Sequence, residues 1–200
     1  GIDYEMFSSM ARKRENRKEA QKLREKFGSD KIVLSVDRLD YTKGIVERLR
    51  AFELFLEKYP EFQERVTLVQ RIPPSRANVR EYQSTLERIN ELVGEINGKF
   101  EKVDWSPVKS FHRYLPDQEM LIPYYLSADV GLVTPLNDGM NLVCKEYVAC
   151  TDDGSLVLSE FAGAAERMEG AIKVNPWDSD EVADALKKAL TMSKDERKKR

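Results

Sequence analysis

Histidine and cysteine are scarce in this 200-residue chain, and their scarcity excludes several kinds of site. His112 is the only histidine, so a metal site built from several histidines is excluded, and a catalytic triad would have to use this one residue. The two cysteines, Cys144 and Cys150, fall in one predicted helix on different faces. That spacing fits neither a disulfide framework nor a zinc site, and we expect a reducing, cytoplasmic setting.

Long apolar runs and a large net charge are also missing. No run reaches the roughly 20 apolar residues that span a bilayer, and residues 1–4 show no basic segment followed by an apolar one. The 33 Lys and Arg nearly balance the 35 Asp and Glu, which gives a net charge of -2. The sequence therefore predicts no membrane segment and gives no electrostatic reason to expect a nucleic-acid partner.

Three familiar site motifs are absent as well. Residues 37–44 read D-R-L-D-Y-T-K-G after the first expected strand, where a dinucleotide site would need G-x-G-x-x-G. The chain has no G-x-x-x-x-G-K-[ST] loop and no G-x-S-x-G turn. Dehydrogenase, ATPase, GTPase and serine-hydrolase chemistry are disfavoured.

The chain instead contains a regular alternation of short apolar runs and amphipathic segments. Strands are expected at residues 32–36, 66–69, 108–114, 128–133, 156–158 and 171–174. Helices are expected near residues 45–56, 79–96, 117–127, 141–150, 162–168 and 180–192, after a charged amphipathic helix over residues 7–27. Asn97 and Gly98 are expected to end the second of these helices, and Pro123 to shorten or kink the third.

Six strands that are each followed by a helical segment predict an α/β fold, because parallel neighbours need crossover connections. We expect a doubly wound parallel sheet with helices on both faces. Ligands bind such sheets at the carboxyl ends of the strands, near the point where the strand order reverses. The loops at residues 37–40, 70–76 and 136–139 should share that rim.

One rim segment, residues 138–146, combines two carboxylates with a predicted helix start. Unpaired N–H groups in a helix's first turn favour anions, and Gly139 allows close backbone approach. Asp138 and Glu146 can accept hydrogen bonds from hydroxyl groups. This combination favours a phosphorylated, hydroxyl-rich ligand, and the candidate is a nucleotide sugar.

Basic residues are predicted on the same rim. Arg38 and Lys43 follow the first strand and Arg76 follows the second. Arg38 and Lys43 together could hold a diphosphate leaving group and stabilise its charge. The alternative is that both only form surface ion pairs, with Asp37, Asp40 or Glu47 as partners.

Several motifs are similar to those of trehalose-6-phosphate synthases, at residues 36–44, 74–76, 105–107, 129–147, 157–165 and 174–178. The resemblance covers nearly the whole chain after Lys31. It implies a retaining, metal-independent glycosyltransferase with a two-domain B-type fold and no cofactor. Such enzymes move glucose from UDP-glucose, or another nucleotide glucose, to glucose 6-phosphate.

The same resemblance implies roles for individual residues. Arg38, Lys43 and Asp138 would be catalytic, with the first two on the donor diphosphate and Asp138 on the hydroxyls of the transferred glucose. Glu146 would hold the ribose, and Arg76 would reach toward the acceptor's phosphate. The full donor set implied by the family is Arg38, Lys43, Pro116, Asp138, Gly139, Met140, Asn141, Leu142, Val143 and Glu146. Pro116 belongs to a stretch, residues 112–116, that departs from the bacterial pattern before Asp117.

The resemblance also sets expectations for domain organisation. Residues 1–30 would be an interdomain linker and lead-in helix, and residues 31–200 a C-terminal, Rossmann-like donor-binding domain, one half of the B-type fold. The N-terminal acceptor domain would be absent, so we expect this chain to bind UDP or UDP-glucose weakly and to have little transferase activity alone. The full-length protein could form homo-oligomers.

Other functions stay open at this stage. A sibling enzyme with a different acceptor, such as a glucosylglycerol-phosphate synthase or a pseudoglycosyltransferase, would share the donor residues. A non-catalytic nucleotide-sensing module is a third reading, and the intact Arg38, Lys43, Asp138 and Glu146 count against it. A fused sugar phosphatase is disfavoured, since residues 37–40 lack D-x-D. UDP, ADP and GDP are not distinguished as donor bases.

Overall fold

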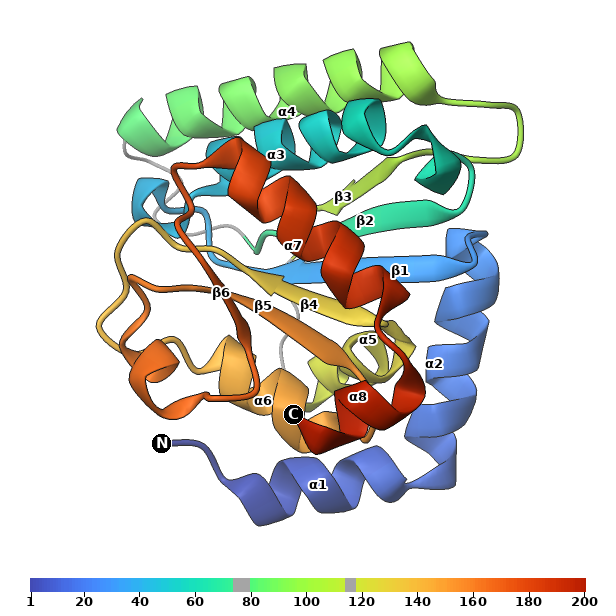
Figure 1. The fold of residues 1–200 in the computed structure, drawn as a ribbon, viewed down its shortest axis with the longest axis vertical. Helices are drawn as coiled ribbons and strands as arrows, with labels where there is room; N and C mark the ends of the chain where they lie inside the picture. Colours follow the sequence, from blue (N-terminus) through green and yellow to red (C-terminus); the bar gives the residue numbers. More distant parts are fainter. Residues whose placement is uncertain (74–79, 114–117) are drawn as a thin grey trace.

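A six-stranded parallel sheet forms the centre of the molecule. The computed structural model describes residues 1–73, 80–113 and 118–200. The strands are β1 (Lys31–Val36), β2 (Val66–Arg71), β3 (Val108–Phe111), β4 (Val130–Val133), β5 (Ser155–Ser159) and β6 (Ile172–Val174), in the order β3-β2-β1-β4-β5-β6. All five neighbouring pairs are parallel (Figure 1).

Helices cover both faces of this sheet. One face carries α3 (Ile45–Lys58), α4 (Arg80–Phe100) and α7 (Ser179–Thr191); in Figure 1, α7 crosses in front of the strands and α3 and α4 lie above them. The other face carries α1 (Tyr4–Arg12), α2 (Arg14–Phe27), α5 (Ile122–Ser127) and α6 (Val143–Cys150). The short α8 (Lys194–Lys199) follows α7. The expected doubly wound α/β class is confirmed.

Alternating side chains of the strands supply the two cores. In β1, Val33 packs with α3, α4 and α7, whereas Ile32 and Leu34 pack with α1, α5 and α6. All three side chains are almost completely buried. Because successive strand residues point to opposite faces, a continuous apolar run is what a sheet covered on both sides requires.

Some expected boundaries were wrong. α4 runs through Asn97 and Gly98 to Phe100, because the Asn97 side chain bonds the N–H and C=O of Val108 (both 3.0 Å) and so holds the last turns of α4 against β3. The expected helix over residues 7–27 is two helices that meet at Lys13, whose backbone is extended. Gly28 ends the second helix, in a left-handed conformation that glycine adopts without strain.

Of two further expected helices, one is partly and the other wholly 3-10. The segment before Pro123 is a 3-10 turn, Gln118–Leu121, and α5 begins directly after it, with Pro123 in its first turn. Proline is tolerated there because the first N–H groups of a helix have no partner in the helix. The segment after β5 is a 3-10 turn, Gly163–Arg167.

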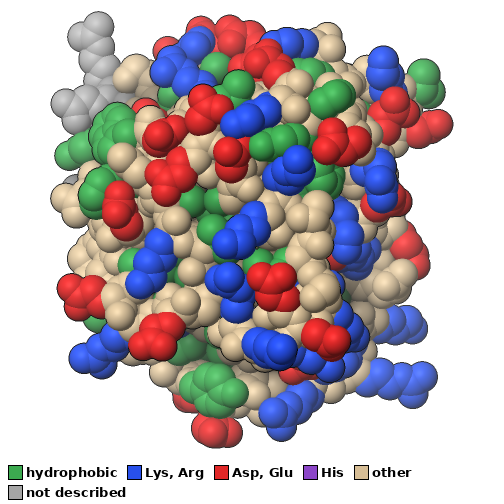
Figure 2. Space-filling view, viewed as in Figure 1, with side chains coloured by type: hydrophobic (Ala, Val, Ile, Leu, Met, Phe, Trp, Pro, Cys, Tyr) green, Lys and Arg blue, Asp and Glu red, His purple; other side chains and the backbone are tan. Residues whose placement is uncertain are grey.

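The reversal of strand order falls between β1 and β4, which pair directly through Val33 and Val130. The loops that leave these two strands therefore meet at one edge of the sheet, as expected for the site. On the face shown in Figure 2, Lys and Arg are interspersed with Asp and Glu. In the described parts of the chain no helix combines the length and the apolar character needed to cross a membrane.

Candidate functional site

The loops that follow β1 and β4 are bonded to each other at the carboxyl edge of the sheet. The carbonyl of Thr42 accepts hydrogen bonds from the N–H groups of Leu136 (2.8 Å) and Asn137 (3.3 Å). Gly44 has a φ of 62°, and a Cβ at this position would lie 2.6 Å from the carbonyl oxygen of Thr134. Only glycine fits both the backbone conformation and this close approach. The two loops thus form one surface.

Lys43 and Asp138 form an ion pair across that surface. Lys43 Nζ lies 2.6 Å from Asp138 Oδ2, and the two side chains are 15% and 14% exposed. The alternative that Lys43 pairs with Asp37, Asp40 or Glu47 is wrong for the described structure. Asp40 instead accepts hydrogen bonds from the N–H and hydroxyl of Thr42 (2.9 and 2.8 Å) and caps the turn Tyr41–Lys43.

Asp138 is held ionised by several donors. Its Oδ1 accepts from the N–H groups of Met140 (3.2 Å) and Asn141 (3.1 Å), and its Oδ2 accepts from Asn141 Nδ2 (3.1 Å) as well as from Lys43. Burial by itself would raise the pKa of Asp138, but these donors hold the pKa below its ordinary value. The Asp138 carboxylate therefore stays ionised at physiological pH, and in this structure its acceptor positions are taken by Lys43 and by its own loop.

The start of α6 leaves two backbone donors unused. Asn141 has a φ of 66°, and its side-chain oxygen accepts a hydrogen bond from the N–H of Cys144 (3.1 Å). The helix begins at Val143, two residues later than expected. Within the described residues, the N–H groups of Leu142 and Val143 donate no hydrogen bond. Such groups, together with the helix dipole, form a place for an anion.

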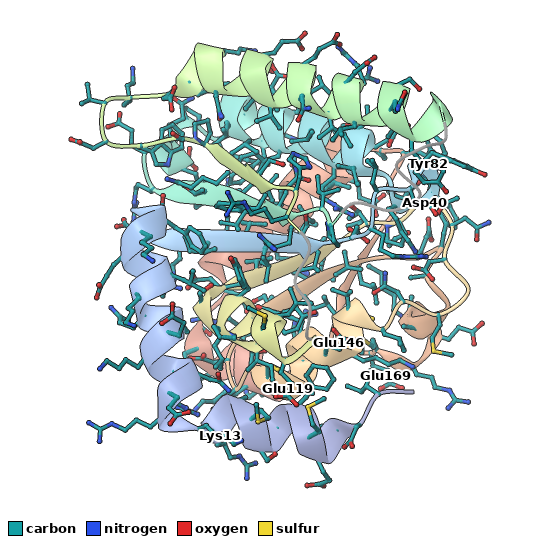
Figure 3. All side chains as sticks on the ribbon, turned by 180° about the vertical axis from the view of Figure 1, so that it is seen from behind. Lys13, Asp40, Tyr82, Glu119, Glu146 and Glu169 are labelled. Carbon is teal, nitrogen blue, oxygen red and sulfur yellow. The ribbon has the colours of Figure 1, made fainter. Side chains whose placement is uncertain are left out.

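Glu146 lies deeper in the same helix. It is 2% exposed, and the hydroxyl of Tyr125 donates to its Oε2 at 2.6 Å. Burial, followed by the charge of Glu146, raises the pKa of Tyr125 well above 10, so the phenol stays a donor. Figure 3 shows Asp40 at the edge of the molecule and Glu146 further in, on α6.

A third loop, after β5, supports the segment that carries Asp138. The N–H of Asp138 donates to Phe161 O (3.3 Å), the N–H of Gly163 donates to Asp138 O (2.9 Å), and that of Ala164 donates to Met140 O (2.9 Å). A Cβ at Gly163 would overlap the carbonyl oxygen of Gly139. These hydrogen bonds hold the Asp138 segment against the turn Gly163–Arg167.

The remaining predicted site residues fall into two groups. Arg38 is exposed and forms no ion pair or hydrogen bond with another described residue, while Gly139, Met140 and Leu142 are exposed on the loop before α6. Arg76 and Pro116, expected at the acceptor phosphate and the nucleotide base, lie outside the described residues. The structure thus brings Lys43, Asp138 and the start of α6 together and leaves Arg38 facing solvent beside Asp40.

The family model for glycosyltransferase family 20 matches residues 1–200. The chain belongs to this family. The 56 kDa subunit of the UDP-forming α,α-trehalose-phosphate synthase of Saccharomyces cerevisiae is 47% identical over 194 residues, which are 96% of this chain and 39% of the yeast protein. The predicted resemblance is therefore confirmed.

Solved structures of family members superpose on the whole chain. The UDP-forming synthase of Burkholderia xenovorans matches with a TM-score of 0.95 and 44% identity over 100% of this chain and 45% of that protein. The Escherichia coli enzyme bound to UDP-2-fluoro glucose matches with a TM-score of 0.93 and 44% identity, again over 100% of this chain and 44% of that one. The chain thus spans less than half the length of these relatives.

No group of three or more potential metal ligands occurs among the described residues of this family member. A hollow of about 340 Å³ lies at the opposite, amino edge of the sheet, where Arg24 and Asp129 contribute to its wall. It shares no residue with the carboxyl-edge cluster of Lys43, Asp138 and the start of α6.

Proposed function

We propose that this chain is the donor-binding part of a retaining glycosyltransferase that transfers glucose from UDP-glucose, or another nucleotide glucose, to glucose 6-phosphate and forms α,α-trehalose 6-phosphate. The observation that carries the proposal is the Lys43–Asp138 pair, set beside the unused N–H groups of Leu142 and Val143 at the strand-order reversal. Relatives named as UDP-forming trehalose-phosphate synthases support the donor, and a Burkholderia xenovorans enzyme solved with glucose-6-phosphate supports the acceptor.

The proposed mechanism relies on charge at the leaving group. When UDP leaves the anomeric carbon, negative charge grows on its diphosphate, and Arg38 and Lys43 stabilise that charge. The N–H groups at the start of α6 contribute in the same direction. We propose that these two cations and the N–H groups stabilise the leaving group without a metal or cofactor.

The other side chains orient the sugar parts of the donor. Asp138 accepts hydrogen bonds from glucose hydroxyls, with Gly139, Met140 and Asn141 lining the approach, and Glu146 accepts from the ribose. The acceptor hydroxyl attacks on the face that UDP leaves, and the leaving phosphate takes its proton, which retains the configuration. Positioning then supplies much of the rate enhancement.

We propose that Arg76 and an N-terminal domain hold the glucose 6-phosphate, that residues 1–30 link the domains, and that the full-length protein works in the cytoplasm, where it could form homo-oligomers. A sibling synthase with another acceptor fits the donor cluster equally well. A purely nucleotide-sensing module fits it less well, since the charged donor residues are all present.

Calorimetric titration of the chain with UDP, ADP and GDP tests this proposal. We expect weak UDP binding, and we expect the double substitution Arg38→Ala and Lys43→Ala to reduce it at least about 100-fold, since two charge-assisted contacts to phosphate are lost. The control is Lys58→Ala with Arg65→Ala, which removes two cations from ion pairs elsewhere on the surface. Equal UDP affinity in both double variants would refute the assigned role.

A further inference from the structure

Arg48 is a fully buried cation that the proposed mechanism does not use. It lies in the first turn of α3, is 1% exposed, and faces the candidate site from inside the protein. Its Nη1 lies 2.7 Å from Asp37 Oδ2, its Nε donates to Thr134 Oγ1 at 2.9 Å, and its Nη2 donates to the carbonyl oxygen of Lys43 at 3.0 Å. Three nitrogens of one guanidinium are therefore engaged.

The three partners come from the segments that build the site. Asp37 directly follows β1, Thr134 directly follows β4, and Lys43 ends the 3-10 turn between β1 and α3. A guanidinium is planar and rigid, so three simultaneous contacts fix its partners relative to one another. The backbone of Lys43 is one of those fixed points, and from it the side chain reaches Asp138.

Stability alone does not account for a charged residue at this place. Burial of an ion pair costs desolvation that well-packed apolar side chains would avoid. Burial also raises the pKa of Asp37, and the adjacent Arg48 opposes that rise. Lys43 and Asp138 are the other charges close to Asp37. The arrangement is better explained by geometry, because only a forked donor can hold all three partners.

We propose that Arg48 is a positioning residue for the donor diphosphate: it holds the main chain at Lys43 against the end of β4, so that the ammonium group points at the phosphates. The proposal rests on the proposed function, since it assigns Lys43 to the diphosphate. It predicts that changes at Arg48 weaken the binding of the phosphate part of the ligand and spare the binding of the nucleoside.

The test compares UDP with uridine, which lacks phosphates, by ligand-observed NMR on Arg48→Lys. Lysine keeps the charge beside Asp37 but cannot make all three contacts. We expect the affinity for UDP to fall at least about tenfold and the affinity for uridine to equal that of the wild type. The matched control is Arg24→Lys, since Arg24 also makes three contacts, with Ser127 O, Asp129 Oδ2 and Asp30 O, at the opposite edge. It should leave both ligands unaffected.

A second variant and a second measurement keep the test decisive. Thr134→Val removes only the acceptor for Arg48 Nε and should give the same selective loss, in a smaller size, if Arg48→Lys fails to fold. Hydrogen exchange of the amides at residues 41–46 needs no ligand, and we expect it to be about tenfold faster in Arg48→Lys than in Arg24→Lys.

The outcomes separate the two proposals. If the wild type binds none of UDP, ADP and GDP, the proposed function fails, and the exchange measurement alone tests whether Arg48 holds the main chain at Lys43. If UDP binds to the wild type, and Arg48→Lys and Thr134→Val weaken the binding of UDP and uridine equally or weaken neither, the positioning role is overturned. Exchange that rises throughout the chain and not mainly at residues 41–46 would overturn it too.

Discussion

Asp129 and Asp138 lie beyond opposite ends of β4, and the two carboxylates have different roles. Both side chains are little exposed, 13% and 14%. Asp129 accepts hydrogen bonds from Arg24 (2.9 Å), from Lys31 (3.2 Å) and from the N–H of Ile32 (2.9 Å). Asp138 accepts from Lys43 and from its own loop. Each is a half-buried carboxylate surrounded by donors.

The difference lies in the donors that remain. At the amino end, Arg24 also bonds the carbonyls of Ser127 and Asp30, so that its contacts fasten α2 to the sheet. At the carboxyl end, Arg38 and the N–H groups at the start of α6 have no partner in the described residues. A network in which every donor has a partner stabilises the fold. A site whose cationic and N–H donors lack partners is suited to bind an anionic ligand.

The largest expected effect separates the two aspartates directly. Asp129→Ala should lower the free energy of unfolding by about 2–3 kcal/mol, because three contacts are lost and two cations stay partly buried. Asp138→Ala should cost a similar amount, because four hydrogen bonds are lost and Lys43, which is 15% exposed, keeps no partner among the described residues. Only Asp138→Ala should also weaken UDP-glucose binding, by more than about tenfold. Urea unfolding and calorimetry measure the two quantities.

The contrast between Asp129 and Asp138 fails if their effects on UDP-glucose binding are reversed. A stable Asp129→Ala variant with impaired UDP-glucose binding would place function at the amino edge. An Asp138→Ala variant that binds UDP-glucose normally would leave that carboxylate with a purely local role in capping the loop before α6.

The fold was largely predictable because its signals are local. The apolar run at residues 32–36 and the stripe that begins at Val79 led to β1 and α4, and the alternation led to a parallel sheet. The errors arose from long-range contacts. Asn97 and Gly98 are a helix-stop signal, but the hydrogen bonds of Asn97 to Val108 override it. Propensity is a weak guide when a tertiary contact competes.

The site was predictable only in part, for the same reason. Lys43 and Asp138 each had a chemical signal in the sequence, but their pairing over 95 positions did not. Arg48 was read as part of an amphipathic helix, although it is among the largest buried side chains. The left-handed backbone of Asn141 and the hydrogen bond from the Tyr125 hydroxyl to Glu146 were not predicted, because no sequence pattern specifies either. Signals for residues that support a site come from the folded structure.

The next largest effects are expected at two glycines, one at each edge of the sheet. A Cβ at Gly163 would overlap the Gly139 carbonyl at the carboxyl edge, and a Cβ at Gly154 would overlap the Tyr147 hydroxyl at the amino edge. Each Gly→Ala change should cost about 1–3 kcal/mol of stability. Only Gly163→Ala should also weaken UDP-glucose binding, by about tenfold, because the loop that carries Asp138 must move.

Calorimetry on both glycine variants, at a temperature where each is folded, decides the question. Equal losses of UDP-glucose affinity would show that binding follows stability and not the position of the loop. A Gly163→Ala variant as stable as the wild type, with normal binding, would show that the Gly139 carbonyl moves aside freely.

The smallest expected effect concerns two buried tyrosines. Tyr125→Phe removes the 2.6 Å hydrogen bond to Glu146, whereas Tyr147→Phe removes only a 3.5 Å contact with the Ala128 carbonyl. We expect Tyr125→Phe to lower the free energy of unfolding by about 1–2 kcal/mol, with a few-fold loss of UDP affinity as Glu146 becomes less ordered. Tyr147→Phe should change UDP affinity little.

The pH dependence tests whether the Tyr125 hydroxyl acts as a donor to a charged Glu146. The folded-state pKa of Tyr125 is raised well above 10, so its contribution is fully present below the unfolded pKa of about 10 and is lost only as pH rises through the folded value. The stability difference between wild type and Tyr125→Phe should therefore stay constant from about pH 6 to pH 9. A difference that shrinks within that range in urea unfolding would mean that the proton is not held on Tyr125, and that Glu146 is not the fixed acceptor that ribose binding requires.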